Sequence, residues 1–229
     1  MIKKVIVMCG RFEANIPKEK LIQKFGINNW QLDNYQPRYN IPPGTSIPII
    51  RQIGDNRIVN EALWGLIPSW SKDKKIAFRT FNARSETLAE KPSFRATYKH
   101  KRCLIPASGY YEWQKIDKNN KQPFWIGRKD KEPFAMAGIF ENWTDTETGE
   151  LIESCTIITR PSYQERKSIH DRMPVILPEN YYSDWLSCEL KGFPAEDMNE
   201  LDYYPISNDV GSPKNNYSFE RLNTDQQYK

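Results

Sequence analysis

Metal ligands are scarce in this 229-residue sequence. It contains two histidines and four cysteines, at positions 9, 103, 155 and 188, and no two cysteines have C-x-x-C spacing. Because these residues are few and far apart in the sequence, they favour neither a zinc site nor a disulfide framework. We therefore expect no metal and no other cofactor, and a reducing cytoplasm is the expected compartment.

The sequence also lacks a hydrophobic run of transmembrane length. Its first residues, Met1–Val7, resemble the start of a signal peptide, but the apolar stretch is too short and Met8 is not a small cleavage-site residue. The same objection applies to lipid attachment at Cys9. Association with a membrane is therefore not expected.

An excess of charge of one sign is nearly absent. Lys and Arg number 33 against 29 Asp and Glu, which gives a net charge of +4. This bias is too small to indicate nucleic acid binding by itself, so any basic groove must be local. A hydrophobic content of 38%, with 13% aromatic residues, is enough for a substantial core. Because no linker is visible, we expect one domain, and a monomer.

Strand patterns dominate after one short helix near the N-terminus. Pro17 and Gly26 bracket apolar residues at helical spacing and predict a helix over residues 17–25. Turn signals predict three hairpins, and four segments between them are interpreted as helices. The hairpin strands are 47–53 with 57–64, 109–116 with 122–128, and 134–143 with 151–159; the helices are 85–90, 93–99, 162–169 and 179–186. This pattern predicts an α+β domain whose antiparallel sheets curl into a barrel-like core with short helices around it.

Cys9 lies in the run Met8-Cys9-Gly10-Arg11-Phe12, and loss of everything before it would make it the first residue. An N-terminal cysteine carries an amine and a thiol on adjacent carbons. The amine can condense with an aldehyde to a Schiff base, and the thiol can then close a stable thiazolidine ring on the same carbon. The amine titrates near ~8 and the thiol near ~8.5, so one neighbouring carboxylate or imidazole can tune both. The alternative is a small buried strand residue, because the preceding stretch is apolar.

Glu112 lies in the middle of the strand predicted over residues 109–116. Strand alternation places Tyr110, Glu112 and Gln114 on one face, and Tyr111 and Trp113 on the other. A carboxylate between aromatic residues is a candidate for burial, which would raise its pKa and suit it to proton exchange near neutrality. The alternative is a solvated glutamate on the outer face.

Two further residues offer polar chemistry at the junctions between elements. His170 follows a predicted helix, and histidine exchanges protons near neutral pH without tuning; it could equally interact with terminal carbonyls of that helix. Asn82 has an amide that could hold a sugar hydroxyl or orient an amine, or cap a helix. Arg84, two residues later, has a fork suited to phosphate.

Six short motifs together resemble the SOS response-associated peptidase (SRAP) family, in the order that this family has. They are the run around Cys9, Arg38-Tyr39-Asn40-Ile41-Pro42-Pro43-Gly44, Trp64-Gly65-Leu66-Ile67-Pro68, Asn82-Ala83-Arg84-Ser85-Glu86-Thr87, Gly109-Tyr110-Tyr111-Glu112-Trp113 and His170-Asp171-Arg172-Met173-Pro174. The resemblance covers residues 8–217 and implies a single SRAP domain there, after an N-terminal extension at 1–7. The chain is polar from about Asn208 onward, which predicts a mobile tail at 218–229.

The resemblance also implies a function. Family membership implies a DNA-damage response protein whose N-terminal cysteine cross-links abasic sites in single-stranded DNA as a thiazolidine, after autoproteolysis exposes that cysteine. Cys9, Asn82, Glu112 and His170 are the implied catalytic residues. Glu112 would shuttle protons, and His170 would protonate the deoxyribose ring oxygen as the sugar opens. Arg11, Asn40, Trp70 and Arg84 are the expected DNA contacts.

The sequence departs from the family pattern in two places. The family's cysteine normally follows the initiator methionine, whereas seven residues precede Met8 here. Either translation starts at Met8 or the segment is removed by the protein itself. Relatives often carry two adjacent tryptophans as a wedge between bases, but here Trp70 stands between Ser69 and Ser71. One stacking contact is therefore expected from Trp70.

Two other functions fit the same residues. A cysteine peptidase acting on other proteins could use Cys9, His170 and Asn82 as thiolate, imidazole and orienting amide, although the local cysteine signature of papain-like enzymes is missing. A non-covalent single-strand DNA-binding module could use Trp30, Trp70 and basic side chains. Only covalent trapping would leave a DNA adduct that survives heat and detergent.

Overall fold

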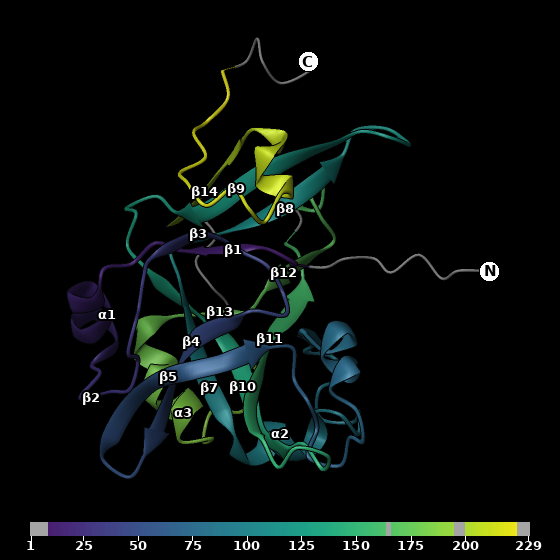
Figure 1. Ribbon diagram of the computed structural model, residues 1–229. Coiled ribbons are helices and arrows are strands. Elements are labelled where there is room, and N and C mark those ends of the chain that lie inside the picture. The colour runs from purple at the N-terminus through teal and green to yellow at the C-terminus, as the bar shows by residue number, and fades with distance from the viewer. Residues whose placement is uncertain (1–8, 164–165, 195–199, 224–229) are drawn as a thin grey trace.

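The computed structural model describes residues 9–163, 166–194 and 200–223. The predicted extension at 1–7 lies outside these residues, as do Met8 and the last six residues of the predicted tail. In the described part, no helix is long and apolar enough to cross a membrane. Strands form two sheets, which lie one above the other in Figure 1, with short helices at the periphery.

Five strands of the larger sheet close into a barrel. They are β4 (Ser46–Ile53), β5 (Asn56–Trp64), β7 (Arg102–Ala107), β10 (Phe134–Thr144) and β11 (Leu151–Pro161). Antiparallel neighbours run in the order β11, β10, β7, β4 and β5, and β5 pairs back onto β11 in parallel at Leu63 and Trp64, which closes the ring. Short strands β2 (Asn29–Trp30), β6 (Asn82–Arg84), β12 (Arg172–Pro174) and β13 (Ile176–Leu177) extend it. The predicted barrel-like α+β fold is confirmed.

The second sheet packs across the barrel and carries the N-terminal strand. Its order is β14 (Leu201–Pro205), β9 (Lys121–Arg128), β8 (Gly109–Lys115), β1 (Phe12–Ala14) and β3 (Arg38–Ile41). Phe12 of β1 pairs with Tyr110 of β8 on one side and with Ile41 of β3 on the other. This central position of β1 fixes where Cys9, three residues earlier, can lie.

Alternate residues of the barrel strands form a core shared with the second sheet. Ile49, Trp64 and Ile105 from the barrel join Phe12 and Tyr110 in one apolar cluster of buried side chains. Burial of such side chains stabilises the fold by roughly 1.5–3 kcal/mol each. The shared cluster locks the two sheets together and so fixes β1 and β8 relative to the barrel.

Short helices lie at the periphery of both sheets. They are α1 (Lys18–Phe25), α2 (Arg95–His100) and α3 (Tyr182–Leu186), with 3-10 helices η1 (Lys74–Arg79), η3 (Glu179–Tyr181) and η5 (Asn208–Gly211). Helices are therefore confirmed at the predicted positions 17–25, 93–99 and 179–186, with ends that differ by at most two residues; the last of them consists of η3 followed by α3. The helix predicted at 85–90 is wrong: these residues form turns, because Ser85 N–H donates to the carbonyl of Thr159 in β11 instead of continuing a helix.

The helix predicted over 162–169 is also wrong for the residues of this segment that the structure describes. Residues 164–165 lie outside the described part, and residues 166–169 form a short 3-10 turn. Ser162 N–H donates to the carbonyl of Asp171, so the segment closes as a loop. This loop brings His170 back beside β12.

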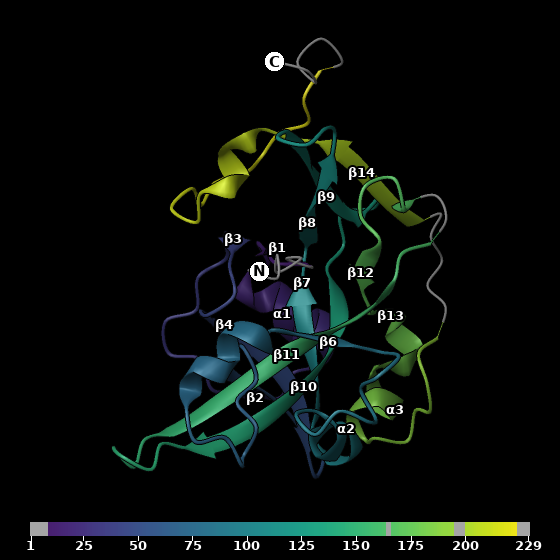
Figure 2. The same cartoon turned by 90° about the vertical axis from the view of Figure 1, so that its right-hand side faces the viewer.

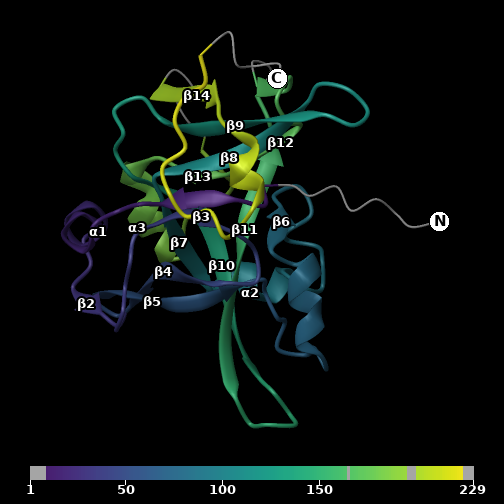
Figure 3. The same ribbon diagram turned by 45° about the horizontal axis from the view of Figure 1, so that its top comes forward.

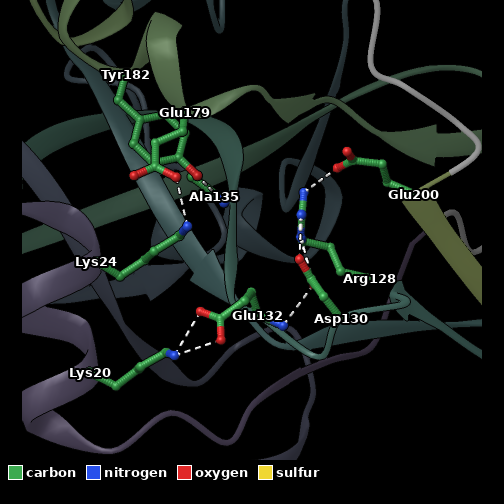
Figure 4. Close-up of polar contacts among 9 residues, drawn as sticks. All are labelled: Lys20, Lys24, Arg128, Asp130, Glu132, Ala135, Glu179, Tyr182 and Glu200. Atoms are coloured by element: carbon green, nitrogen blue, oxygen red, sulfur yellow. Dashed lines mark hydrogen bonds and ion pairs between the residues drawn. The ribbon is translucent and has the colours of Figure 1, made fainter.

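Ion pairs tie α1 to η3 and to the chain that follows β9 (Figure 4). Lys24 pairs with Glu179 at 2.6 Å, and Lys20 pairs with Glu132 at 2.7 Å. Arg128 bonds both Asp130 and Glu200, the latter at 2.7 Å. Because these pairs are largely exposed, each contributes at most ~1 kcal/mol.

The chain after β14 packs back onto the second sheet. Residues 218–223 were expected in a mobile tail, but Phe219 is buried and meets Tyr111 edge to face at 5.7 Å. Leu222 N–H donates to the carbonyl of Pro205 at 2.9 Å, and Arg221 pairs with Asp202. One buried aromatic residue among polar neighbours thus anchors this part of the chain.

Candidate active site

Cys9 lies immediately before β1 and is held at both ends of its backbone. Its nitrogen donates to Oε1 of Glu112 at 3.0 Å, and its carbonyl accepts from Nδ2 of Asn82 at 3.3 Å. The residue has a φ of 35°, in the left-handed region that cysteine rarely adopts. Three of the four predicted catalytic residues therefore meet at the backbone of Cys9.

Glu112 comes from β8, and the predicted alternation explains its place. Tyr110 joins the core between the sheets, whereas Tyr111 and Trp113 belong to a separate cluster on the other face. Glu112 is 3% exposed, and this burial raises its pKa to about 6 even though His170 and the bonds from Cys9 lower it. Its carboxylate therefore exchanges protons close to neutral pH.

His170 lies on the other side of that carboxylate. Its Nδ1 is 3.9 Å from Oε2 of Glu112 and 3.4 Å from Oδ1 of Asp171. The backbone nitrogen of Arg172 lies 3.1 Å from the same Nδ1. The carbonyl oxygen of Arg172 lies 3.2 Å from the same atom, so the tautomer of the ring decides whether Nδ1 accepts from the Arg172 N–H or donates to the Arg172 carbonyl. Nδ1 of His170 thus faces the backbone of Arg172 and the carboxylates of Glu112 and Asp171.

Glu86 and Thr159 hold Arg172, which lies two residues after His170 in the chain. Neither Glu86 nor Thr159 was predicted from the sequence to belong to the site. Both Nη atoms of Arg172 bond the carboxylate of Glu86, and Nη2 also donates to the carbonyl of Thr159 at 2.7 Å. The arginine keeps the pKa of Glu86 low, at about 2. Glu86 stands in the same motif as Asn82, which is the only sequence signal that could have drawn attention to it.

The thiol of Cys9 is buried and protonated at neutral pH. Burial raises its pKa well above the usual range, and the nearby charge of Glu112 raises it further. The positive charge of Arg172 lowers it only in part. Such a thiol needs a base before it can act as a nucleophile, and Glu112 is the carboxylate in contact with it.

A narrow pocket opens beside this group. Its lining includes Tyr110, Glu112, Ile126, Ser162, Arg166, Ile169, His170 and Arg172. Arg166 is buried, and its Nη2 donates to the carbonyl of Leu201 at 3.2 Å. The sequence did not single out Arg166, because it fell inside a segment interpreted as a helix. Among the described residues, no group of three or more His, Cys, Asp or Glu side chains is placed to hold a metal ion.

The four residues predicted to contact DNA fall into two kinds of environment. Trp70 and Arg84 are exposed, as a contact with a strand requires. Arg11 donates to the carbonyls of Val210 and Gly211 and to Oδ1 of Asn40 at 2.8 Å. Its remaining surface is partly exposed.

Asn40 is the least accessible of the four. It is 2% exposed, and its Nδ2 donates to the carbonyls of Val210, Ser212 and Asn215. This burial indicates a structural role, in which Asn40 holds the chain around η5 against β3. A direct contact between Asn40 and DNA stays a prediction that its burial does not favour.

Fold and site together define a class of protein: a small closed barrel with a second sheet across it, and a buried cysteine and carboxylate beside a partly buried histidine. The family model described as SOS response associated peptidase (SRAP) matches residues 8–213. The chain belongs to this family.

Relatives agree over nearly the whole length of the chain. "Abasic site processing protein YoqW" of Bacillus subtilis is 41% identical over 91% of this chain and 96% of its own length. "Abasic site processing protein YedK" of Escherichia coli is 30% identical over 91% of this chain and 96% of its own. A crystal structure of a protein from Bacteroides thetaiotaomicron is 32% identical and superposes with a TM-score of 0.80, covering 90% of this chain and 97% of that one.

Proposed function

We propose that this protein is a DNA-damage response enzyme that processes abasic sites in single-stranded DNA by bonding them to Cys9. Relatives of the same family are named for abasic site processing, which supports DNA as the partner. The observation that carries the proposal is the 3.0 Å bond between the nitrogen of Cys9 and the carboxylate of Glu112. A carboxylate with a pKa of about 6 is placed at the nitrogen that must become a nucleophile.

The chemistry begins with the sugar. His170 protonates the ring oxygen of the abasic deoxyribose as the bond between that oxygen and C1′ breaks, and the hydroxyl on C1′ gives up its proton to leave an aldehyde. The amine of Cys9 attacks C1′, and Glu112 takes the proton that the nitrogen loses. Departure of one water then leaves an imine.

Ring closure uses the thiol of the same residue. Glu112, in contact with the thiol, accepts its proton while sulfur bonds to C1′, and the proton passes to the imine nitrogen. Both the nitrogen and the sulfur of Cys9 are then bonded to one carbon, with one water lost overall. Closure on a buried carbon shields the product from solvent and so protects the strand from scission.

This mechanism requires the peptide bond before Cys9 to be broken. We propose that the thiol attacks the carbonyl carbon of Met8, that the nitrogen of Cys9 leaves with a proton supplied by Glu112, and that water then hydrolyses the thioester. Residues 1–8 depart with a new carboxylate, and Cys9 keeps a free amine and a free thiol. The remaining chain, which begins at Cys9, is proposed to act as a cytoplasmic monomer.

The site is less well suited to a papain-like peptidase. Such an enzyme needs a thiolate whose pKa is lowered by a neighbouring imidazolium, whereas burial and Glu112 raise the pKa of Cys9. Glu112, rather than an amide, is the group that lies near both the nitrogen of Cys9 and the imidazole of His170. This arrangement serves proton transfer at nitrogen.

The test uses a fluorescent single-stranded oligonucleotide with one abasic site. Wild-type protein should give a DNA-protein band that survives heating in detergent, and an oligonucleotide with an intact base should give none. A non-covalent binding module would give no such band with either strand. A peptidase acting in trans would cleave added protein substrates and leave the DNA free.

A further inference from the structure

An aromatic floor lies on the face of the second sheet that points away from the barrel (Figure 2). It consists of the indole of Trp125 in β9 and the phenol ring of Tyr204 in β14, whose centroids are 5.0 Å apart and whose planes are inclined by 23°. The two residues pair across adjacent strands, and Figure 3 shows β14 and β9 side by side on this face. The two stacked rings together present a broad aromatic surface that does not belong to the group around Cys9.

Two glycines let the indole of Trp125 lie flat on the sheet. A Cβ at Gly109 in β8 would be 2.4 Å from the indole Nε1, and a Cβ at Gly127 in β9 would be 2.4 Å from the indole Cη2. A side chain at either position would therefore push the ring off the strands. The space above Gly109 also lets the indole reach across β8 to β1, where its Nε1 donates to Oε2 of Glu13 at 2.8 Å. A carboxylate is thus fixed at the edge of the aromatic floor.

Glu13 is a carboxylate suited to a cationic neighbour. Burial raises its pKa, and its hydrogen bonds, together with the nearby charge of Lys131, offset only part of this rise. A partly buried carboxylate is stabilised in its charged form by a cation close to it. The faces of tryptophan and tyrosine rings attract cations as well. The carboxylate and the two rings therefore define a site for one positive charge.

The side chain of Lys131 occupies this site. Its ammonium lies 4.2 Å from the ring centre of Trp125 and 5.3 Å from that of Tyr204. Lys131 belongs to the exposed turn between β9 and β10, and its φ of 60° is in the left-handed region, which residues with a side chain seldom adopt. Among the described residues, its ammonium forms no ion pair. Contacts between an exposed cation and a ring are weak, so another cation can displace Lys131 at little cost.

We propose that Trp125, Tyr204 and Glu13 bind the alkylammonium group of another molecule, and that Lys131 is the intramolecular competitor for this site. The side chain of Lys131 shows that an ammonium on an aliphatic stem fits here. A phosphate or carboxylate ligand would instead be repelled by Glu13 and by the ring faces. Because ring faces contact methyl groups rather than hydrogen-bond donors, a quaternary ammonium is the best match.

The test titrates choline into ¹⁵N-labelled protein and follows the indole N–H signal of Trp125 by NMR, with Trp125→Phe to assign that signal. Lys131→Gly removes the competitor and suits the left-handed backbone, so choline should shift the signal of this variant in a saturable way. The wild-type protein should need about five times as much choline, because its own ammonium competes. Lys129→Ala, which removes an exposed lysine from the same turn, is the matched control and should behave like wild type.

Two further comparisons, both in the Lys131→Gly protein, test the nature of the contact. The alcohol 3,3-dimethylbutanol has the shape of choline without its charge, and it should bind about tenfold more weakly. Tyr204→Phe should keep the affinity for choline, because the ring remains. Tyr204→Leu should weaken binding about fivefold, because leucine is apolar but has no ring face.

The alkylammonium group could belong to a free quaternary ammonium compound or to a lysine side chain of a partner protein. The amide of Nα-acetyl-lysine serves as the probe for the second source. Tighter binding of choline than of this amide supports a free quaternary compound, and the reverse order supports a lysine side chain.

Three results would overturn the proposal. They are the lack of a saturable shift in Lys131→Gly, equal binding of choline and 3,3-dimethylbutanol, and equal affinities of wild type and Lys131→Gly for choline. The probes contain neither an aldehyde nor DNA, and the site does not depend on the proposed function. Failure here would therefore leave the chemistry at Cys9 untouched, and failure of cross-linking would leave this site untouched.

Discussion

Replacing Glu112 with glutamine should stabilise the folded protein at neutral pH while removing its reactivity. Burial raises the pKa of Glu112 from 4.5 to about 6, so at pH 7 the folded state keeps an ionised carboxylate in surroundings that disfavour the charge. A rise of this size corresponds to ~2 kcal/mol, at 1.36 kcal/mol per pKa unit. Glutamine carries no charge, and its amide oxygen can still accept from the nitrogen of Cys9.

The pH dependence gives the sign of this effect. Because the folded pKa of Glu112 is the higher one, protonation of this group adds stability that is fully present below pH 4.5 and is lost as the pH rises through about 6. Glu112→Gln has no such dependence. The free energy of unfolding of the variant, relative to wild type, should therefore increase by most of ~2 kcal/mol between pH 4.5 and pH 7.5.

Urea unfolding at the two pH values measures this difference, and Glu61→Gln, an exposed carboxylate on β5, controls for the loss of one negative charge. The same Glu112→Gln protein should form the DNA adduct at least a hundredfold more slowly, in line with the ~10²–10⁴ of a lost acid-base group. A variant whose relative stability is the same at both pH values would refute the burial argument. Adduct formation at the wild-type rate would refute the role in proton transfer.

Substitutions at three other positions separate the parts of the account. Cys9→Ala should lose the heat-stable adduct yet keep weak strand binding, and Cys9→Ser should fail too because an oxazolidine hydrolyses readily; a wild-type adduct rate in Cys9→Ala, seen on a denaturing gel, would exclude this nucleophile. Glu86→Gln should lower the free energy of unfolding at pH 7 by less than ~1 kcal/mol, because the carboxylate is half exposed. Since the pKa of Glu86 is lowered to about 2, this loss should shrink as the pH falls below 4.5; a loss that grows instead would contradict the pairing with Arg172. Phe219→Ala should cost about 3 kcal/mol in urea unfolding if this ring is the anchor of residues 218–223, and an unchanged midpoint would mean that the segment contributes nothing.

Local signals in the sequence were enough for most of the strands. The hairpin of β4 and β5 follows from the turn residues Gly54-Asp55 between two strand-like runs. In β8, Glu112 is buried, as expected for a carboxylate between aromatic residues. Closure of the barrel was beyond such signals, because the parallel pairing of Leu63 with Ser154 joins residues far apart in the chain. The false helix at 85–90 has the same origin, since its backbone bonds β11 and its Glu86 bonds Arg172.

The sequence identified the residues that meet at the site, but not the residues that hold them in place. Cys9, Asn82, Glu112 and His170 were identified because each residue type suits aldehyde or proton chemistry and each stands in a family motif, and the structure brings all four together. Asn40 and Arg11 also stand in motifs, yet their partners are carbonyls of residues 210–215. Nothing near Asn40 in the sequence indicates that distant segment, so its burial against residues 210–215 could not be predicted from the sequence.

The central claim is that both the amine and the thiol of Cys9 take part, and the intact mass of protein expressed from Met1 tests it most directly. The account predicts that the wild-type chain loses residues 1–8, that Cys9→Ala keeps them, and that abasic single-stranded DNA adds to the wild-type chain with loss of one water. A wild-type chain that retains Met1 and still forms a heat-stable adduct would contradict the claim, because its Cys9 nitrogen would be locked in a peptide bond.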